Sequence, residues 1–328
     1  MPSLLSLVRA QAVPVATVQR ALAHDRVHHA YLFDGPDGVG KELTAFGLAQ
    51  ALVCERRAPG GDDACGECGA CVRVLPRAGE ARPRHPDVVL LGRALYEPAQ
   101  IGRRTPETQD ISIDQVRTLV LARAAFPPHE GRARVYVVRS AEELSQSAAN
   151  ALLKTLEEPS QRTHFILLTA RPDALLSTIR SRTQRVRFGA LPESVVAELL
   201  AEKGVDLLRA KAVAALSEGS LSLAQSLADP EASEAREDFV RRALAAMRAP
   251  TMGPALEIGD EAKKDKDALP EKLTALAVHL AAEARRAPDT AEAERAAERF
   301  SQVLRTLRDL DRNAAAQLAV EAMFVRTR

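Results

Sequence analysis

The stretch Gly35-Pro36-Asp37-Gly38-Val39-Gly40-Lys41-Glu42 decides the fold of this chain. It follows an apolar segment, Tyr31-Leu32-Phe33, and precedes a helix that we expect over residues 41–53. Glycines at this spacing let main-chain N–H groups surround phosphate oxygens, and the lysine adds a positive charge. The order of strand, glycine-rich loop and helix predicts a phosphate-binding loop in an α/β domain. Its candidate nucleotide-binding residues are Gly35, Gly38, Gly40 and Lys41.

The groups that hold magnesium in an active nucleotidase are missing from this pattern. The residue after the lysine is normally Ser or Thr, whose hydroxyl binds the metal, and here it is Glu42. A second apolar strand, Val135-Tyr136-Val137-Val138, should lead into two acidic residues but leads into Arg139 and Ser140. Hydrolysis needs metal, water and charge stabilisation together. We therefore expect no ATP hydrolysis by this chain.

Two interpretations of the loop remain open at this point. Lys41 and the glycines form a vestigial turn that packs the following helix on the sheet, or they bind a nucleotide or another anion weakly and without metal. Glu42 adds negative charge near the loop, which disfavours a triphosphate. ATP is therefore a doubtful cofactor.

All four cysteines fall in one short segment with the spacing C-x10-C-x2-C-x2-C: Cys54, Cys65, Cys68 and Cys71. In a cytosolic chain this cluster indicates a metal site rather than a set of disulfides. Four thiolates suit tetrahedral zinc, although an iron–sulfur cluster is the alternative for C-x2-C-x2-C. We predict one structural zinc ion, because four cysteine ligands leave no open position for catalysis.

Composition excludes several functional classes. The 328 residues predict two or three domains, and an apolar content of 46% is ample for buried cores. With 45 basic and 44 acidic side chains, the chain is not a polybasic nucleic-acid binder. The absence of Trp argues against base-stacking platforms for single strands. No apolar run reaches membrane length and no signal-peptide pattern begins the chain, so we expect a cytoplasmic protein with no membrane partner.

Strands alternate with helices through the first part of the chain, which predicts a parallel sheet with right-handed crossovers. The expected strands lie near residues 31–33, 87–91, 135–138, 165–169 and 186–188. Past Leu191 only helices are expected, at 192–203, 206–217, 220–228, 231–248, 269–287, 289–311 and 312–326. The segment from Gly259 to Asp267 is charged and nearly free of apolar residues, and we expect a loose loop there.

Several motifs resemble those of bacterial clamp-loader subunits of the AAA+ class. Residues 147–159, SAANALLKTLEEP, are similar to the helix that follows the Walker B strand in that family. His29-Ala30-Tyr31-Leu32-Phe33 and His85-Pro86-Asp87 resemble segments before the phosphate loop and the second strand. Ser181-Arg182-Thr183 resembles the family's Ser-Arg-Cys motif, with Thr in place of Cys. The four-cysteine insertion lies where the family carries its zinc module, and residues 313–321 resemble its closing collar helix.

The resemblance implies an α/β plus all-α architecture. Residues 1–190 would form an AAA+ type P-loop domain with a parallel sheet and a zinc module at residues 54–71. Residues 191–230 would form a small three-helix lid, with a hinge near Pro230. Residues 231–328 would form a helical collar domain for oligomerisation. The match covers nearly the whole chain and is most specific through residue 190.

The family contains two kinds of subunit with these motifs. The tau/gamma motor hydrolyses ATP, and the delta-prime stator has defective nucleotide chemistry. The substitutions at Glu42, Arg139 and Ser140 make this chain similar to delta-prime, as does Ser222 where a motor carries its sensor-2 arginine; Thr169 still matches the sensor-1 position. The resemblance implies a subunit that helps to load the sliding clamp on primed DNA during replication. It would belong to a DNA-directed DNA polymerase holoenzyme, a nucleotidyltransferase, without independent catalysis.

The partners implied are the tau/gamma and delta subunits and, through the complex, the sliding clamp and primer–template DNA. Arg182 is the implied catalytic residue, an arginine finger that enters a neighbour's ATP site in trans. Without the family context, residue chemistry alone would favour an ordinary surface arginine. The alternative functions are an ATP-hydrolysing tau/gamma-type motor of the same complex and an unrelated P-loop kinase or zinc-dependent nucleic-acid enzyme. The helical C-terminal part offers no catalytic motif for the last of these.

Overall fold

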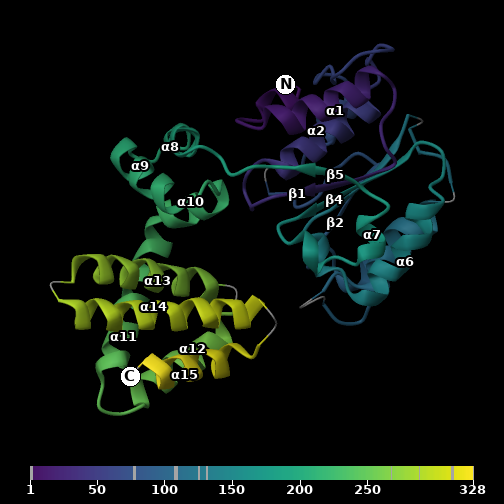
Figure 1. Cartoon of the computed structure of the whole chain (residues 1–328). Helices are drawn as coiled ribbons and strands as arrows, with labels where there is room; N and C mark the ends of the chain where they lie inside the picture. The colour runs from purple at the N-terminus through teal and green to yellow at the C-terminus, as the bar shows by residue number, and fades with distance from the viewer. Residues whose placement is uncertain are drawn as a thin grey trace. The chain divides into compact units, whose positions relative to one another are not determined.

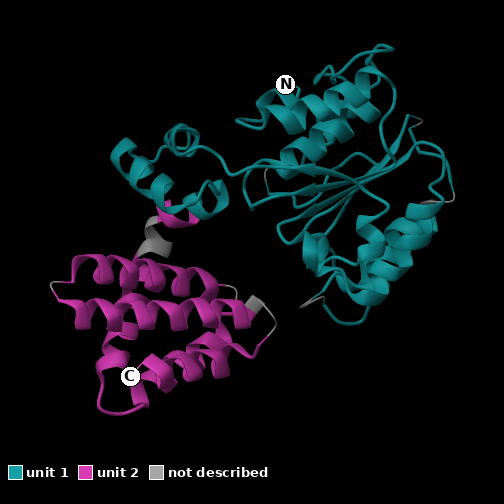
Figure 2. Ribbon diagram, in the orientation of Figure 1, with its two compact units in different colours: residues 1–225 teal, residues 226–328 magenta. Residues whose placement is uncertain are grey.

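The computed structural model describes residues 3–76, 79–106, 110–124, 126–130, 132–266, 268–287, 289–311 and 314–327. The chain divides into two compact units, residues 1–225 and 226–328 (Figure 2). Most of the expected lid segment belongs to the first unit, and the division into three domains stays a prediction. Among the described helices, none combines the length and the apolar character that crossing a bilayer requires.

Five parallel strands form the sheet of the first unit, in the order β2-β3-β4-β1-β5 (Figure 1). The strands are β1 (Ala30–Asp34), β2 (Val88–Leu91), β3 (Arg134–Val138), β4 (Thr163–Thr169) and β5 (Gln184–Arg187). Every expected strand is confirmed, with bounds that move by one or two residues. Because all strands are parallel, the loops that follow β1, β3 and β4 meet at the carboxyl edge of the sheet.

Helices cover both faces of the sheet, as the alternation of strands and helices predicts (Figure 1). On one face lie α1 (Ala12–Ala23) and α2 (Lys41–Val53), and on the other α6 (Gln146–Glu157) and α7 (Ser177–Arg180). The hydroxyl of Ser145 caps α6 by accepting the N–H of Ala148 at 3.2 Å. Pro159 comes shortly after the end of α6, and proline cannot continue a helix because it lacks the main-chain N–H.

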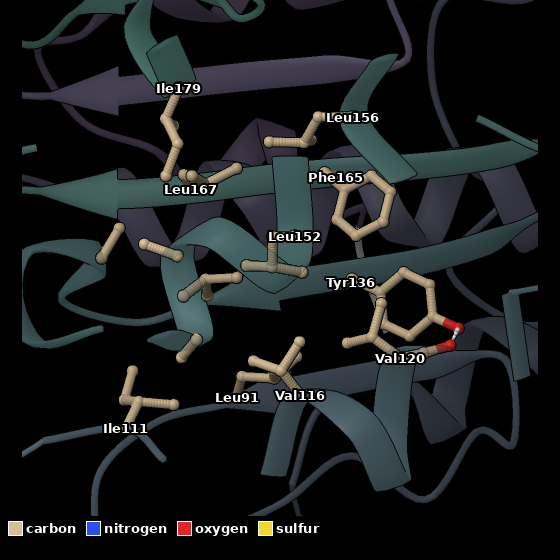
Figure 3. Close-up of a cluster of buried hydrophobic side chains, with 14 of the residues drawn as sticks. Leu91, Ile111, Val116, Val120, Tyr136, Leu152, Leu156, Phe165, Leu167 and Ile179 are labelled. Atoms are coloured by element: carbon tan, nitrogen blue, oxygen red, sulfur yellow. Dashed lines mark hydrogen bonds between the residues drawn. The ribbon is translucent and has the colours of Figure 1, made fainter. Parts of the chain in front are cut away.

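Aromatic and aliphatic side chains fill the space between α6 and the sheet (Figure 3). The rings of Tyr136 on β3 and Phe165 on β4 stack with centroids 5.0 Å apart. Leu152 and Leu156 pack over them from α6, and both are almost fully buried. The Tyr136 hydroxyl donates to the Val120 carbonyl at 3.4 Å, so even the polar tip of this core residue has a partner.

The remaining elements of the first unit are short. Ser112 caps α4 (Ile113–Val116) by accepting the N–H of Gln115. A π-helical turn, Arg117–Leu121, and α5 (Ala122–Ala124) follow. The other elements are η1 (Leu5–Leu7), α3 (Gly69–Arg73), η2 (Pro98–Ile101), η4 (Ala141–Glu143), η5 (Pro172–Ala174), α8 (Glu193–Glu202), α9 (Leu207–Leu216) and α10 (Leu221–Ala228), whose last residues belong to the second unit.

The second unit is a bundle of α-helices with its own apolar core. Its helices are α11 (Pro230–Arg248), α12 (Gly253–Lys264), α13 (Leu269–Arg286), α14 (Thr290–Asp311) and α15 (Ala316–Thr327). Four of them confirm helices expected from the sequence. Asn313, which begins the collar-like motif, lies outside the described residues.

The expectation of a loose loop from Gly259 to Asp267 is wrong. Helix α12 includes residues 259–264, and Asp267 lies outside the described residues. Ala255, Ile258, Gly259 and Ala262 are buried along one face of this helix. A Cβ at Gly259 would lie 2.9 Å from Cγ of Glu321, so the missing side chain permits close packing against α15. Gly259 and Ala262 thus extend the buried face begun by Ala255 and Ile258, so this helix packs even though its second half is nearly free of apolar side chains.

Candidate functional site

The phosphate-binding loop lies at the carboxyl edge of the sheet, between β1 and α2. Gly38 has φ of +73° and Gly40 has φ of +104°, conformations that L side chains rarely adopt. A Cβ at Gly38 would lie 2.2 Å from the main-chain nitrogen of Ser222, at the start of α10. The Ser220 hydroxyl donates to the Asp37 carbonyl at 2.7 Å. The predicted loop is therefore present, and α10 is packed directly against it.

Lys41 turns back on its own loop instead of standing free. Its Nζ donates to the carbonyl oxygens of Gly35 and Pro36, the latter at 2.7 Å, and lies 3.3 Å from Asp37 Oδ1. The side chain is only 7% exposed. All three ammonium protons thus have acceptors within the loop. An incoming phosphate would have to displace these contacts to reach the lysine.

The two positions that should hold magnesium are joined by an ion pair. Arg139 Nε donates to Glu42 Oε2 at 2.8 Å, and Arg139 Nη2 donates to Glu42 Oε1 at 2.6 Å. The Glu42 carboxylate raises the pKa of the Arg139 guanidinium, against the opposing effect of burial. A guanidinium cannot polarise a water molecule as a metal ion does. The sequence identified both substitutions but not that the two residues pair.

Thr169, at the sensor-1 position, ends β4 beside the loop. Its carbonyl accepts the N–H of Gly35 at 3.2 Å, and its hydroxyl accepts the N–H of Arg171 at 3.0 Å. The side chain is 1% exposed, so it has no open path to a ligand in this conformation. In the described part of the chain, this edge of the sheet has the backbone of a nucleotide site without its metal chemistry.

The structure brings the four predicted zinc ligands together. The Sγ atoms of Cys54, Cys65, Cys68 and Cys71 all lie within 4.8 Å of one another. Cys65 Sγ and Cys71 Sγ are 3.9 Å apart, close to the sulfur–sulfur spacing of about 3.8 Å that a tetrahedral zinc–thiolate site requires. Main-chain N–H groups of Cys65 and Cys68 donate to the sulfurs of Cys54 and Cys65 at 3.4 Å each. The residues present therefore fit a zinc ion.

The environment of the cluster favours ionised sulfur at one position. Burial raises the pKa of the Cys65 thiol, but N–H groups of Glu67 and Cys68 and the neighbouring thiols outweigh burial and lower it to about 6. Burial, together with the thiols of Cys68 and Cys54, raises the pKa of Cys71. Four thiols this close cannot all lose their protons without a cation to offset the charge, and zinc supplies that charge when bound.

The cysteine segment is anchored to the body of the first unit on several sides. Arg57 Nη1 donates to the carbonyl oxygens of Leu22 and Gly61 at 3.3 and 3.0 Å. Arg73, at the end of α3, makes two hydrogen bonds to Glu130, at 2.7 and 2.6 Å. These contacts fix the segment beside α1 and the loop before β3, which is the arrangement of a structural module.

Arg182 lies at the amino ends of the strands, opposite to the carboxyl ends where the phosphate-binding loop lies. It precedes β5 by two residues and lines a surface hollow with His28 and His29, which precede β1. The phosphate loop follows β1, so the two features are separated by the length of that strand, about 13 Å at the rise per residue of a parallel strand. Arg182 cannot reach the phosphate position of its own chain from there.

Three contacts fix the guanidinium of Arg182 at the surface. Nη2 lies 2.6 Å from Oε1 of Glu157, the last residue of α6. Nη1 donates to the Thr178 carbonyl at 3.0 Å and to the Ser181 hydroxyl at 3.3 Å. The side chain remains 35% exposed. Spacing along the chain does not indicate that Glu157 contacts Arg182, because the two residues are 25 positions apart.

Fold and site together define a class of protein: an α/β P-loop type domain in which an ion pair stands where a nucleotidase binds its metal ion. The chain belongs to the family described as DNA polymerase III, delta subunit, whose model matches residues 10–192, more than half of its length. The resemblance to bacterial clamp-loader subunits is thereby confirmed.

Individual relatives carry two different names. A DNA polymerase III subunit delta' from Pseudomonas aeruginosa is 41% identical over 154 residues, 47% of this chain and 41% of the relative. A subunit gamma/tau from Mycobacterium bovis is 36% identical over 200 residues, 61% of this chain and 31% of the relative. The chain thus spans less than half the length of these two relatives. A solved gamma-subunit-related protein from Thermotoga maritima aligns over 96% of this chain with a TM-score of 0.49 and 18% identity.

Proposed function

We propose that this chain is the delta-prime, or stator, subunit of a DNA polymerase III clamp loader and does not hydrolyse ATP itself. It would help to load the sliding clamp on primed DNA in the cytoplasm, with tau/gamma and delta subunits as partners. It would contribute no nucleotidyl transfer of its own to the polymerase holoenzyme. The observation that carries this proposal is the ion pair between Glu42 and Arg139.

The ion pair supports a stator because it replaces both halves of a metal site at once. One partner stands at the hydroxyl position of the loop and the other at the first acidic position after β3. Lys41 is bonded to its own loop, and Ser222 rests against Gly38. A motor must open this region to exchange nucleotide, whereas these contacts stabilise a closed loop. We infer that the glycine-rich loop here has a structural role.

Arg182 is proposed to act as an arginine finger in trans. Its separation from the chain's own phosphate loop by the length of β1 argues against a role on a nucleotide of the same chain. An arginine supplied by a neighbour typically increases phosphoryl-transfer rates by about 10³–10⁵. The proposed target is ATP bound by an adjacent motor subunit, since the guanidinium is held at the surface and always charged.

The other two modules are proposed to be architectural. The four cysteines would hold one structural zinc ion, because their sulfurs all lie within 4.8 Å of one another. The second unit contains residues 231–328, which are proposed to form the collar and would join the subunits into a ring. Leu318 and Val325, each 66% exposed, lie seven residues apart on α15 and therefore on one face. An exposed apolar stripe of this kind suits an interface with a neighbouring helix.

The test is reconstitution of the loader with tau/gamma and delta subunits. Arg182→Ala should lower the ATPase activity stimulated by clamp and primed DNA, and with it clamp loading, while assembly is unchanged. Arg182→Lys should restore little, because an ammonium lacks the planar fork with which a guanidinium meets two phosphate oxygens side by side. Arg187→Ala, at another exposed arginine, is the matched control. Unchanged ATPase in a verified Arg182→Ala complex would reduce the chain to an architectural subunit.

A motor subunit of the same complex is the second candidate, and the 36% identity to a gamma/tau subunit favours keeping it. It predicts steady-state ATP turnover by the complex that depends on Lys41 of this chain. Under the stator proposal, Lys41→Ala leaves both ATPase and clamp loading nearly unchanged. The two candidates therefore differ in the outcome of a single substitution.

A further inference from the structure

The ion pair between Arg182 and Glu157 is too exposed to contribute much to folding. The two side chains are 35% and 47% exposed. Pairs at such sites add little to stability, because water screens the charges and both side chains lose rotamer freedom. Asp173 and Arg180, a pair at 2.8 Å a few residues away, are even more exposed. A role in folding therefore does not account for the contact with Glu157.

Glu157 is carried by a rigid part of the chain. It is the last residue of α6, and the preceding Leu156 is 2% exposed within the main core. The His29 ring, through Nε2, bonds the Leu156 carbonyl at 3.1 Å, which fixes the end of the helix against the segment before β1. The carboxylate thus projects from a fixed point. Arg182 stands on a turn after the short helix α7, with several rotatable bonds of its own.

We propose that Glu157 is a positioning residue for Arg182, an inference that rests on the proposed function of Arg182 in trans. The carboxylate holds Nη2, while the Thr178 carbonyl and Ser181 hydroxyl hold Nη1. Together they immobilise the guanidinium before a neighbour's ATP arrives. Ordering a long side chain in advance removes that entropy cost from the moment of phosphoryl transfer. The Nε–H group and the second N–H of Nη2 remain outside these three contacts and can face two oxygens of an incoming phosphate.

The variants that test this are close in size and position. Glu157→Gln removes the charge and keeps the shape, and Glu157→Asp keeps the charge on a shorter stem. Glu158→Gln is the matched control, because Glu158 is the next residue, is exposed, and has no ion pair within the described residues. In the reconstituted loader we expect Glu157→Gln to lower the stimulated kcat by about 2- to 10-fold at unchanged KM for ATP. Glu157→Asp should recover part of this loss, and Glu158→Gln should behave as wild type.

Non-additivity identifies the partner through which Glu157 acts. The double variant Glu157→Gln with Arg182→Ala should be no slower than Arg182→Ala alone. A further loss in the double variant, or a faster complex with Glu157→Gln, would overturn the positioning role. Wild-type kcat for Glu157→Gln alongside a slow Arg182→Ala complex would overturn it too, and would leave the trans arginine intact.

A second measurement on the free chain does not depend on ATPase activity. Side-chain ¹⁵N relaxation of the Arg182 Nε–H group should report an ordered guanidinium in wild type and in Glu158→Gln, and a more mobile one in Glu157→Gln. Equal order in all three proteins would contradict the inference. If Arg182→Ala had no effect in the loader, the proposed function would fail as well, and ordering by Glu157 would have no role in catalysis.

Discussion

Arg139 Nη2 and Glu42 Oε1 lie 2.6 Å apart, although the two residues are 97 positions apart in the chain. Each stands where an active nucleotidase carries a metal-binding group, and each neutralises the charge of the other. A carboxylate alone would repel a triphosphate, and an arginine alone would attract one. As a pair they contribute neither effect strongly. The ion pair therefore takes the place of the metal-binding groups, and each of the two charged side chains has a partner at the carboxyl edge of the sheet.

The isolated chain should show no ATP turnover above background, because the residues that the structure describes assemble no metal ligand set around the loop. Lys41→Ala should leave this zero rate unchanged. The measurement is steady-state phosphate release by the purified chain, with a tau/gamma subunit as the positive control. Turnover by the chain that disappears in Lys41→Ala would reject the stator assignment and favour the motor.

Purified protein should contain about one equivalent of zinc, bound by the four clustered cysteines. Cys68→Ser should lower the zinc content and leave the sheet folded, because the segment is attached at the periphery of the strand order. Elemental analysis and far-ultraviolet circular dichroism measure the two effects. Iron accompanied by visible absorbance would show a cluster instead of zinc.

Asp87, in the His85-Pro86-Asp87 motif, should be among the most sensitive positions in the first unit. Its oxygens accept the N–H groups of His129 and Glu130 at 2.6 and 2.7 Å, and it pairs with the buried Arg134 at 3.4 Å. Asp87→Ala leaves that guanidinium buried without its counter-ion, which typically costs about 3–5 kcal/mol. The motif is therefore explained by structure rather than by binding.

Tyrosine fluorescence during urea unfolding measures this loss in the first unit alone. All three tyrosines, Tyr31, Tyr96 and Tyr136, lie before residue 226, and the chain has no Trp. Asp173→Asn is the control, since that carboxylate pairs with Arg180 but is 95% exposed. It should shift the midpoint little. Equal shifts for both variants would contradict the central role of the buried pair.

Local sequence signals predicted the sheet, its loop and the cysteine cluster. Strands such as Val135–Val138 are continuous apolar runs because both of their faces are covered. The cysteines are close to one another in the sequence, between positions 54 and 71, so their cluster is local. The arrangement of α12 was missed because Gly259 and Ala262 pack through their small size, not through apolar surface. Such packing depends on the partner helix, which the sequence does not identify.

The contacts that close the loop could not be predicted because they join distant segments. Glu42 meets Arg139 only once β1 and β3 are placed in one sheet, and Ser222 meets Gly38 only after the chain has passed through β5. The sequence gives opposite charges at Glu42 and Arg139, which is consistent with pairing but does not specify it. Similarly, the contact between Glu157 and Arg182 depends on where α6 ends relative to β5.

The first unit should lose stability as the pH falls below neutral. Burial, the largest effect, lowers the pKa of His29, His85 and His164 below the ordinary value of 6.5. In the unfolded chain these histidines take up protons near pH 6.5, whereas the folded chain resists protonation to lower pH. Unfolding is therefore favoured as the pH falls through 6.5. The contribution of the neutral histidines to the free energy of unfolding is fully present above that pH.

The urea midpoint from tyrosine fluorescence should accordingly be lower at about pH 5.5 than at about pH 8, a range that lies above the ordinary titration of carboxylates. His164→Gln should weaken this pH dependence, because burial lowers the pKa of His164. The bond from Nδ1 to the His28 carbonyl at 3.1 Å acts in the opposite direction and is outweighed. His24→Gln, at an exposed histidine, is the control and should leave the slope unchanged. A midpoint that rises at lower pH would contradict the sign of this argument.

The proposed collar should depend on the exposed face of α15. Leu318→Glu combined with Val325→Glu places two charges on the apolar stripe, and charge at the centre of an interface is unfavourable because it must lose its water. Both side chains are exposed in the single chain, so its helix content and thermal unfolding should change little. Co-purification with the tau/gamma and delta subunits should fall sharply. Leu208→Glu, at an 80% exposed leucine on α9, is the control and should assemble normally.

A chain ending at residue 230 should likewise remain folded in its first unit and fail to assemble. If the α15 variant assembled normally and the truncated chain did not, the interface would lie on another face of the second unit. If both assembled normally, the proposed collar would be rejected.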